Sequence, residues 1–264
     1  SCFAMTEVDT AGSNPTLLEA RAVKDGDHYI LNGRKWYTTA AEGSAFAIAM
    51  MVTNPDVNPA LRASMFIVPT NTPGFRILRN IPIMGETGSD YASHAEVMFE
   101  NCRIPKENLL GREGQGFKMA MRVLDKGRIH IAAVCVGVAR RMLADALAYA
   151  AERQQFGQAI GDFQLVQAML ADSQAELYAA RCMVMDAARR RDDGQNVSTE
   201  ASCCKLFASE MCGRVADRAV QIFGGAGYMR ETVVERLYRD ARLYPIGGGT
   251  REIMNEIISK TEGY

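Results

Sequence analysis

Apolar and polar positions in the first part of the chain alternate over short runs. These runs lie at 20–23, 29–31, 45–52, 64–69, 75–78 and 95–99, and each predicts a β-strand. Turn-forming pairs such as Asn32-Gly33 and Asn54-Pro55 separate them. Because short strands at close spacing are typical of closed or stacked sheets, the pattern predicts an antiparallel β-barrel or sandwich over residues 1–112.

The apolar spacing becomes helical after a glycine-rich junction at 112–116. The helical pattern starts at Gly116 and continues over 131–147, with a long helix beginning near Ile131. The patterns that follow it cover 170–190, 200–223, 231–243 and 251–260. We therefore expect four or five helices, the larger ones forming a four-helix-bundle-like domain over 113–264. The predicted fold class is α+β in two domains.

Two helix boundaries carry sequence signals. The segment 156–161 contains two glycines and interrupts the helical pattern, which predicts two long antiparallel helices joined by a short turn. Asp162 follows that segment and is predicted to cap the second long helix. Thr250 follows the triplet 247–249, which is all glycine, and is predicted to cap the last helix.

Composition and charge exclude several classes of protein. The apolar content of 48% and the charged content of 23% are ordinary for a globular protein. A formal net charge of -1 argues against a nucleic-acid partner, and no apolar run predicts a membrane span. The seven cysteines show no metal-binding spacing, so we expect reduced thiols, no metal site and a cytoplasmic protein, or a mitochondrial-matrix protein if eukaryotic.

Several residues could bind a phosphate and a flat heterocycle. Arg153 precedes the helix junction, with Phe156 and Gln164 beyond it; a guanidinium can bind phosphate and an aromatic ring can pack on a base. Taken alone, these residues are better explained as a solvated arginine and a core phenylalanine. Trp36, the only tryptophan, could likewise be ordinary strand packing.

Other stretches allow close approach of a ligand. The segment 221–228 carries three glycines after a helix, without the spacing of a dinucleotide-binding fingerprint, and glycines let a backbone approach another surface closely. A helix that begins after Thr250 would attract an anion to its N-terminus. Asp125 and Arg128 form an i, i+3 charge pair that could also be a plain surface pair.

Taken together, six motifs resemble those of the acyl-CoA dehydrogenase family of flavoproteins, in the family's order across essentially the whole chain. They are Met5-Thr6-Glu7, Asn32-Gly33-x-Lys35-Trp36-x-Thr38, Leu110-Gly111-x-x-Gly114-x-Gly116-Phe117, Arg153-x-x-Phe156-Gly157, Gln221-x-x-Gly224-Gly225 and Gly249-Thr250-x-Glu252. The family carries a further all-helical domain before the point at which this chain begins.

The resemblance implies FAD as the cofactor. Cofactor contacts are expected from Phe3, Met5, Thr6, Trp36, Tyr37, Thr38, Arg153, Phe156, Gln164, Gln221, Gly224, Gly225, Thr250 and Glu252. Substrate contacts are expected from Ser13, Asp125, Arg128 and Gly249. The resemblance also implies that the protein is a homo-oligomer, a dimer of dimers, because cofactor sites in the family are shared between subunits.

The implied reaction forms a 2,3-trans-enoyl-CoA from an acyl-CoA. A carboxylate removes the α-proton, the β-hydride passes to flavin N5, and an electron-transfer flavoprotein accepts the electrons. The family places that carboxylate at the position of Gly248 or, in one branch, at that of Gly127, so the catalytic base of this chain is unknown.

Several explanations of the two glycines remain open. Glu7, Glu86 in the loop 85–89, or a residue of the absent domain could be the base. The chain could instead be a flavin oxidase of the same fold, a non-catalytic subunit that binds flavin and acyl-CoA, or an engineered variant without its base.

Overall fold

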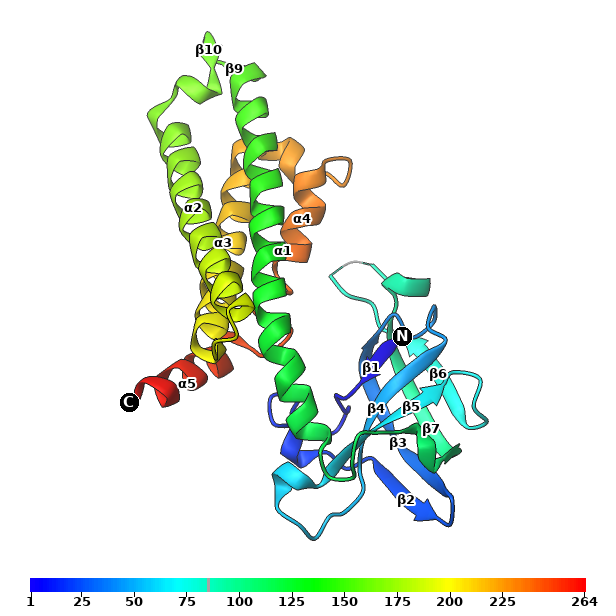
Figure 1. Cartoon of the computed structure of the whole chain (residues 1–264). Coiled ribbons are helices and arrows are strands. Elements are labelled where there is room, and N and C mark those ends of the chain that lie inside the picture. Colours follow the sequence, from blue (N-terminus) through cyan, green and yellow to red (C-terminus); the bar gives the residue numbers. More distant parts are fainter. Residues whose placement is uncertain (85) are drawn as a thin grey trace. The chain divides into compact units, whose positions relative to one another are not determined.

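The structure is a computed structural model that describes residues 1–84 and 86–264. It consists of two compact units, Ser1–Arg122 and Val123–Tyr264 (Figure 1). Gly85, the first residue of the predicted loop 85–89, lies outside the described residues. The first helix starts at Gly116, and its Ala120 packs with Leu18 and Met50, so the first compact unit includes the start of this helix.

The first unit contains one sheet, which has eight strands among the described residues. The strands are β1 (Cys2–Ala4), β2 (Arg21–Asp25), β3 (His28–Thr39), β4 (Phe46–Val52), β5 (Ala63–Pro69), β6 (Phe75–Asn80), β7 (His94–Pro105) and β8 (Leu109–Leu110). Their order is β6-β7-β3-β2-β4-β5-β8, with β1 on β4. The predicted antiparallel sheet is corrected to a mixed one, because β4 pairs in parallel with both β1 and β2.

Strand β4 shows why a run of apolar residues forms a strand here. Ala47, Ala49 and Met51 face one buried cluster. Met50 and Val52 point to the other face and join a second cluster. A strand covered on both faces has no polar side, so its sequence is continuously apolar rather than alternating.

The pairing of β3 with β7 contains an irregularity that matters for the site. Lys35 pairs with Val97 and Thr38 pairs with Ala95, so β3 has more residues than β7 over this interval. Tyr37 lies inside the interval with a positive φ of 51°. This is the geometry of a β-bulge, which redirects the side chains that follow it.

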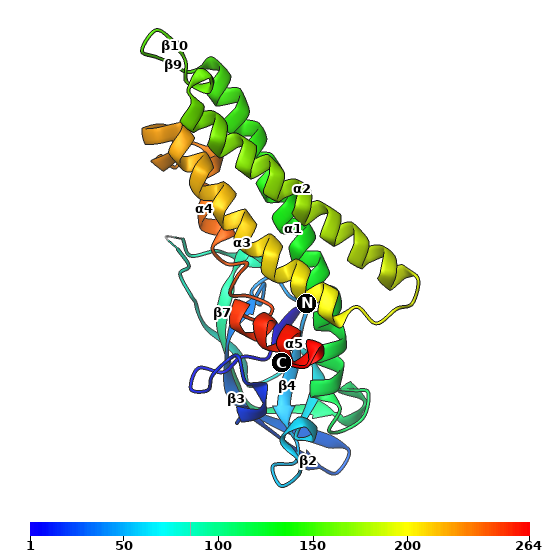
Figure 2. The ribbon, with the colours of Figure 1, turned by 90° about the vertical axis from the view of Figure 1, so that its left-hand side faces the viewer.

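The second unit is helical. It comprises most of α1 (Gly116–Glu152), followed by α2 (Gln164–Asp192), α3 (Ser198–Phe223), α4 (Val233–Ala241) and α5 (Arg251–Glu262). Figure 2 shows α2 running beside α3, and the shared core of α1, α2 and α3 is rich in buried alanines that allow close packing. The predicted two-domain α+β fold class is therefore confirmed.

The predicted helix caps had different outcomes. The Thr250 hydroxyl accepts a hydrogen bond from the Ile253 backbone N–H at 3.3 Å, which confirms the cap of α5. The prediction for Asp162 is wrong, because α2 begins later and Phe163 occupies its N-cap without a side-chain bond. Asp162 lies instead in the 3-10 turn Ile160–Asp162.

The described residues contain no helix that combines the length and the apolar character of a membrane span. Within the same part of the chain, no group of His, Cys, Asp or Glu side chains could hold a metal ion. The seven cysteines are all free thiols.

Candidate functional site

The β-unit holds residues 5–7 tightly against β3. The Trp36 backbone N–H donates to the Thr6 carbonyl at 3.0 Å. The Lys35 ammonium donates to the Met5 carbonyl at 2.9 Å and to a Glu7 carboxylate oxygen at 2.7 Å. Two segments named by the sequence motifs, 5–7 and 35–38, are thus brought together in space.

Rings and hydroxyls on this part of the sheet differ in their accessibility. Tyr37 is 50% exposed, its ring centroid lies 4.3 Å from that of Trp36, and Phe3 is also exposed. Thr38 is fully buried, and its hydroxyl has no hydrogen-bond partner among the described residues. The exposed hydroxyl is that of Thr39, which lies 3.0 Å from His94 Nδ1.

Sequence reasoning did not single out Thr39. After the bulge, Tyr37 and Thr39 stand on either side of the buried Thr38, and alternation along a strand places both on the accessible face. The sequence does show this alternation. Which residues face outward, however, depends on the bulge, and no residue pattern predicts the bulge.

Glu7, one of the suggested bases, is occupied by structural bonds. One carboxylate oxygen accepts from the Glu19 backbone N–H at 2.7 Å. The other accepts from the Ala20 N–H at 3.0 Å and from Lys35. Both oxygens of this buried carboxylate are therefore engaged by donors within the β-unit, which leaves neither free to contact a substrate. Ser13, predicted to contact substrate, lies in an exposed loop.

The junction between α1 and α2 is a β-hairpin rather than a simple turn. Strands β9 (Gln154–Gln155) and β10 (Gln158–Ala159) pair across Phe156 and Gly157, whose φ values are 51° and 82°. Two positive φ values are the mark of a tight hairpin turn, which disfavours a bulky residue. Phe156 is nevertheless 93% exposed at the tip. An exposed ring held in a disfavoured conformation suggests a contact outside the chain.

Polar groups accompany that ring. Arg153 is exposed and has no ion-pair partner in the part of the chain that the structure describes. Gln164 is exposed at the start of α2. A free guanidinium, an amide and an aromatic ring therefore occur within one short segment of the surface.

The glycine-rich segment after α3 forms the 3-10 turn Gly224–Tyr228. Gly224 adopts a φ of 59°, while a Cβ on Gly227 would lie 2.6 Å from the Val220 carbonyl oxygen. Gly225 has open space around it, and Gln221 is exposed. Two of the glycines are thus required by the turn itself, and the third leaves the backbone accessible.

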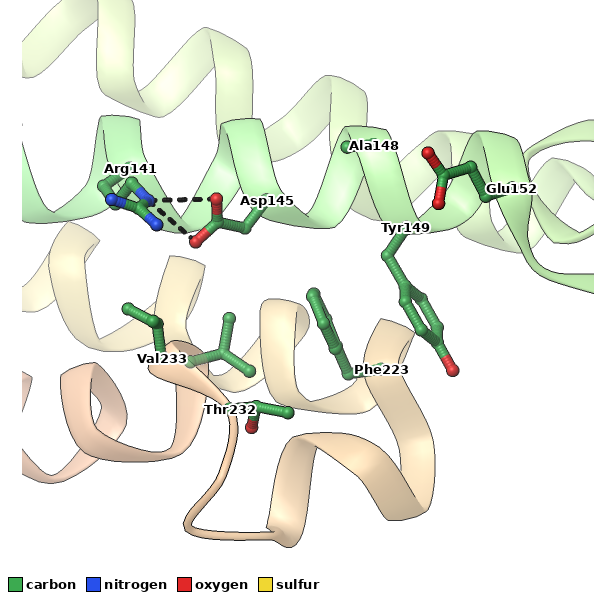
Figure 3. A pocket seen from close by; sticks show the side chains of 9 residues that line it. Arg141, Asp145, Ala148, Tyr149, Glu152, Phe223, Thr232 and Val233 are labelled. Carbon is green, nitrogen blue, oxygen red and sulfur yellow. Dashed lines mark hydrogen bonds and ion pairs between the residues drawn. The ribbon is translucent and has the colours of Figure 1, made fainter.

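A groove of about 340 Å³ lies between α1 and the end of α3 (Figure 3). The rings of Tyr149 and Phe223 stack in its wall at 4.3 Å and 14°. Arg141 Nε donates to both carboxylate oxygens of Asp145 at 2.9 Å. Glu152 and Phe223 line the groove. Glu152 directly precedes Arg153 in the chain, and Phe223 directly precedes the glycine-rich turn.

The glycine turn before α5 is surrounded by buried cations. Lys205 of α3 is fully buried and its ammonium donates to the Gly249 carbonyl. Burial lowers the pKa of Lys205 to about 8. Arg128 of α1 is 5% exposed; it donates to Asp125 at 2.8 Å, while its Nε has no partner among the described residues.

These contacts gather several of the predicted residues. A Cβ on Gly249 would lie 3.9 Å from Arg128 Nη2, so Asp125, Arg128, Gly249 and the Thr250 cap form one cluster. Glu252 is exposed on the first turn of α5. Lys205 was missed, because a single lysine in a helical pattern is ordinarily a surface residue.

The two glycines at the family's base positions differ in the room around them. A Cβ on Gly127 would meet no described atom within 4 Å. A Cβ on Gly248 would lie 2.7 Å from Ile131 Cδ1, and the residue has a φ of 70°. A side chain can therefore be added at 127 without strain but not at 248.

Comparison with known proteins identifies the family. Residues 2–102 match the family model described as acyl-CoA dehydrogenase, middle domain, and residues 114–262 match the one described as acyl-CoA dehydrogenase, C-terminal domain. The chain belongs to the acyl-CoA dehydrogenase family.

Individual acyl-CoA dehydrogenase relatives agree with this assignment. The chain is 44% identical over 258 residues to the probable acyl-CoA dehydrogenase YngJ of Bacillus subtilis, covering 98% of this chain and 67% of that protein. It is 40% identical to the caffeyl-CoA reductase-Etf complex subunit CarC of Acetobacterium woodii, covering 97% and 66%. The chain thus spans about two thirds of the length of these relatives.

One solved structure of the same fold is described as a complex with FAD. The structure described as the FAD complex of PigA matches with a TM-score of 0.92 and 32% identity, over 99% of this chain and 67% of that one.

Proposed function

We propose that this chain is the flavin-binding part of an acyl-CoA dehydrogenase, an FAD-dependent oxidoreductase acting on CH–CH groups. The observation that carries the proposal is the match of both halves of the chain to the family's middle and C-terminal domains. The exposed polar and aromatic groups on each unit support it.

The donors present suit FAD. On the β-unit, Tyr37 offers an accessible ring, and Thr6 and Thr39 offer hydroxyls near it in the fold. On the helical unit, Arg153 suits a pyrophosphate and Phe156 an adenine. The remaining predicted contacts, among them Trp36, Thr38, Gln164, Gln221 and Gly225, stay proposals.

FAD, when bound, would supply the acceptor for a hydride from the substrate β-carbon. The residues of this chain would bind the cofactor and hold it in a fixed orientation. We assign the isoalloxazine edge to Met5, Thr6 and the exposed face of β3. The phosphates are assigned to Arg153 and to the N-terminus of α5, where Thr250 caps the helix and the backbone N–H groups favour an anion.

Substrate binding is assigned to Ser13 and to the cluster of Asp125, Arg128 and Gly249. Their charges and backbone groups suit the polar portion of an acyl-CoA. Removal of the α-proton requires a carboxylate. Glu7 is committed to Lys35 and to two backbone N–H groups, which leaves Glu86 and residues outside this chain as the bases to test.

A second function is favoured by one specific observation. Glycine at both 127 and 248 leaves no proton acceptor at either family position. The chain could therefore be a non-catalytic subunit that binds flavin and acyl-CoA, or a flavin oxidase of the same fold. In the anaerobic titration below, an oxidase would be bleached by its substrate and would regain its colour by reducing oxygen once air is admitted, whereas a binding subunit would not be bleached at all.

The proposed partners follow from the family and from a relative's name. CarC is described as a subunit of a complex with Etf, which supports an electron-transfer flavoprotein as the electron acceptor. The exposed hairpin ring at Phe156 supports a homo-oligomer, a dimer of dimers, in which this ring contacts a neighbouring subunit's cofactor. A monomer in light scattering with flavin still bound would contradict the oligomer.

The deciding experiment is anaerobic titration of the purified protein, reconstituted with FAD, with acyl-CoAs of graded chain length. Bleaching of the flavin absorption band, followed by transfer of electrons to an electron-transfer flavoprotein, is the expected result. A stable yellow protein that no acyl-CoA bleaches would establish the binding subunit. A protein that takes up no FAD would overturn both the dehydrogenase and the binding-subunit proposals.

A further inference from the structure

Lys35 is a fully buried lysine that none of the assigned roles requires. Its side chain is 0% exposed in the interior of the β-unit. The ammonium lies 2.7 Å from Glu7 and 2.9 Å from the Met5 carbonyl oxygen. Burying an ammonium costs far more than burying an apolar group, so its position calls for a reason beyond packing.

The Lys35–Glu7 pair connects three segments of the chain. Glu7 accepts from the backbone N–H groups of Glu19 and Ala20, and the bridge between Glu7 and Lys35 lies beside β3. The segment 5–7 has no regular secondary structure of its own beyond this bridge. Its position relative to β3 therefore depends on this ion pair and on the bond between Trp36 and Thr6.

Lys35 also acts on one particular peptide group. The carbonyl that it contacts belongs to Met5, and the same peptide carries the Thr6 N–H. Neither that N–H nor the Thr6 hydroxyl has a hydrogen-bond partner among the described residues. A cation bonded to a carbonyl polarises its peptide, which makes the N–H at the other end a stronger donor.

We propose that Lys35 is a positioning residue that orients and polarises the Met5–Thr6 peptide, so that Thr6 presents its N–H and hydroxyl to an electron-rich edge of the bound flavin. The inference rests on the proposed function, because it assumes that flavin binds at this edge. It assigns to Lys35 no contact with the cofactor or the substrate.

The experiment compares four forms of the full chain after reconstitution with FAD: the native protein, Lys35→Met, the double variant Lys35→Met/Glu7→Leu, and Lys24→Met. Lys24 is an exposed lysine on β2 of the same sheet and serves as the matched control. The double variant replaces the buried ion pair by apolar groups, a change that proteins often tolerate. It guards against the case in which Lys35→Met leaves Glu7 buried without a partner and does not fold.

The measurements are the FAD dissociation constant, the position of the flavin absorption band and the flavin midpoint potential. Both Lys35 variants are expected to bind FAD on the order of tenfold more weakly and to shift the band and the potential, because a charge-assisted polarisation is lost. Lys24→Met should match the native protein in all three.

Two results would overturn the inference. One is a folded Lys35 variant with native band and potential, which would leave Lys35 a purely structural group even if affinity fell. The other is failure of both Lys35 variants to fold. Absence of FAD binding by the native protein is a different result, since it refutes the proposed function before any variant is compared.

Discussion

Restoring a carboxylate at each of the two glycine positions gives the most direct test of the missing base. Gly127 lies inside α1, and a Cβ added there would have no described atom within 4 Å, whereas Gly248 has a positive φ and Ile131 close by. Gly127→Glu and Gly248→Glu are therefore chemically identical changes in two different steric settings. We expect the first to be tolerated and the second to be strained.

The magnitudes follow from backbone conformation and space. Glycine inside a helix costs about 0.5–1 kcal/mol relative to alanine, so Gly127→Glu should leave stability unchanged or raise it by about 0.5 kcal/mol. At Gly248, a left-handed backbone costs a side chain about 1–2 kcal/mol. The Cβ contact of 2.7 Å with Ile131 Cδ1 adds about 1 kcal/mol of overpacking, although the isoleucine end can move.

Thermal unfolding and flavin bleaching together read out the result. The two variants should differ by about 2–3.5 kcal/mol, which corresponds to roughly 4–14 °C in Tm for a chain of this size. Gly127→Glu should also accelerate bleaching by acyl-CoA, and Gly127→Gln, of the same size but without a proton acceptor, should not. Equal stability of the two glutamate variants, or faster bleaching in the glutamine control, would refute the reasoning.

Three further variants test the helical unit. Phe156→Gly should weaken FAD binding about tenfold while leaving stability equal or higher, since the ring is exposed and its φ is positive; an unchanged FAD titration would contradict this. Arg153→Ala should weaken FAD binding and reduce its dependence on salt, and salt dependence equal to that of the native protein would count against a phosphate contact. Lys205 has its pKa lowered by burial from 10.5 to about 8, so between about pH 8 and 10.5 the unfolded chain binds more protons than the folded one. Urea unfolding should therefore show the native protein gaining stability relative to Lys205→Met as pH rises through this range, and a constant difference would disprove the shift.

Most of the element pattern was predictable from the chain. The predicted strand runs at 45–52, 64–69 and 75–78 coincide closely with β4, β5 and β6, because apolar periodicity and turn residues act locally. The long strands β3 and β7 were underestimated. Residues near the ends of both strands are polar and lie outside the predicted apolar runs. They are in strand conformation because β3 and β7 pair with each other along most of their length.

The sequence alone also determined the family and the residues worth testing, because the order and spacing of motifs can be recognised without knowledge of the fold. It could not decide which of those residues are accessible. Thr38 is buried while Tyr37 and Thr39 are exposed, and this depends on a bulge in the pairing with β7.

Only the tertiary structure decided the roles of the charged groups. Glu7 was a possible base in the sequence and is a structural carboxylate in the fold, since Lys35 and two backbone N–H groups surround it. In the sequence, nothing distinguishes Lys205 from the other lysines in helical segments. In the fold, it is buried and donates a hydrogen bond to the Gly249 carbonyl. The physical reason is the same in each case: the protonation and bonding of an ionisable group depend on neighbours that are distant in the chain and are brought together only by packing.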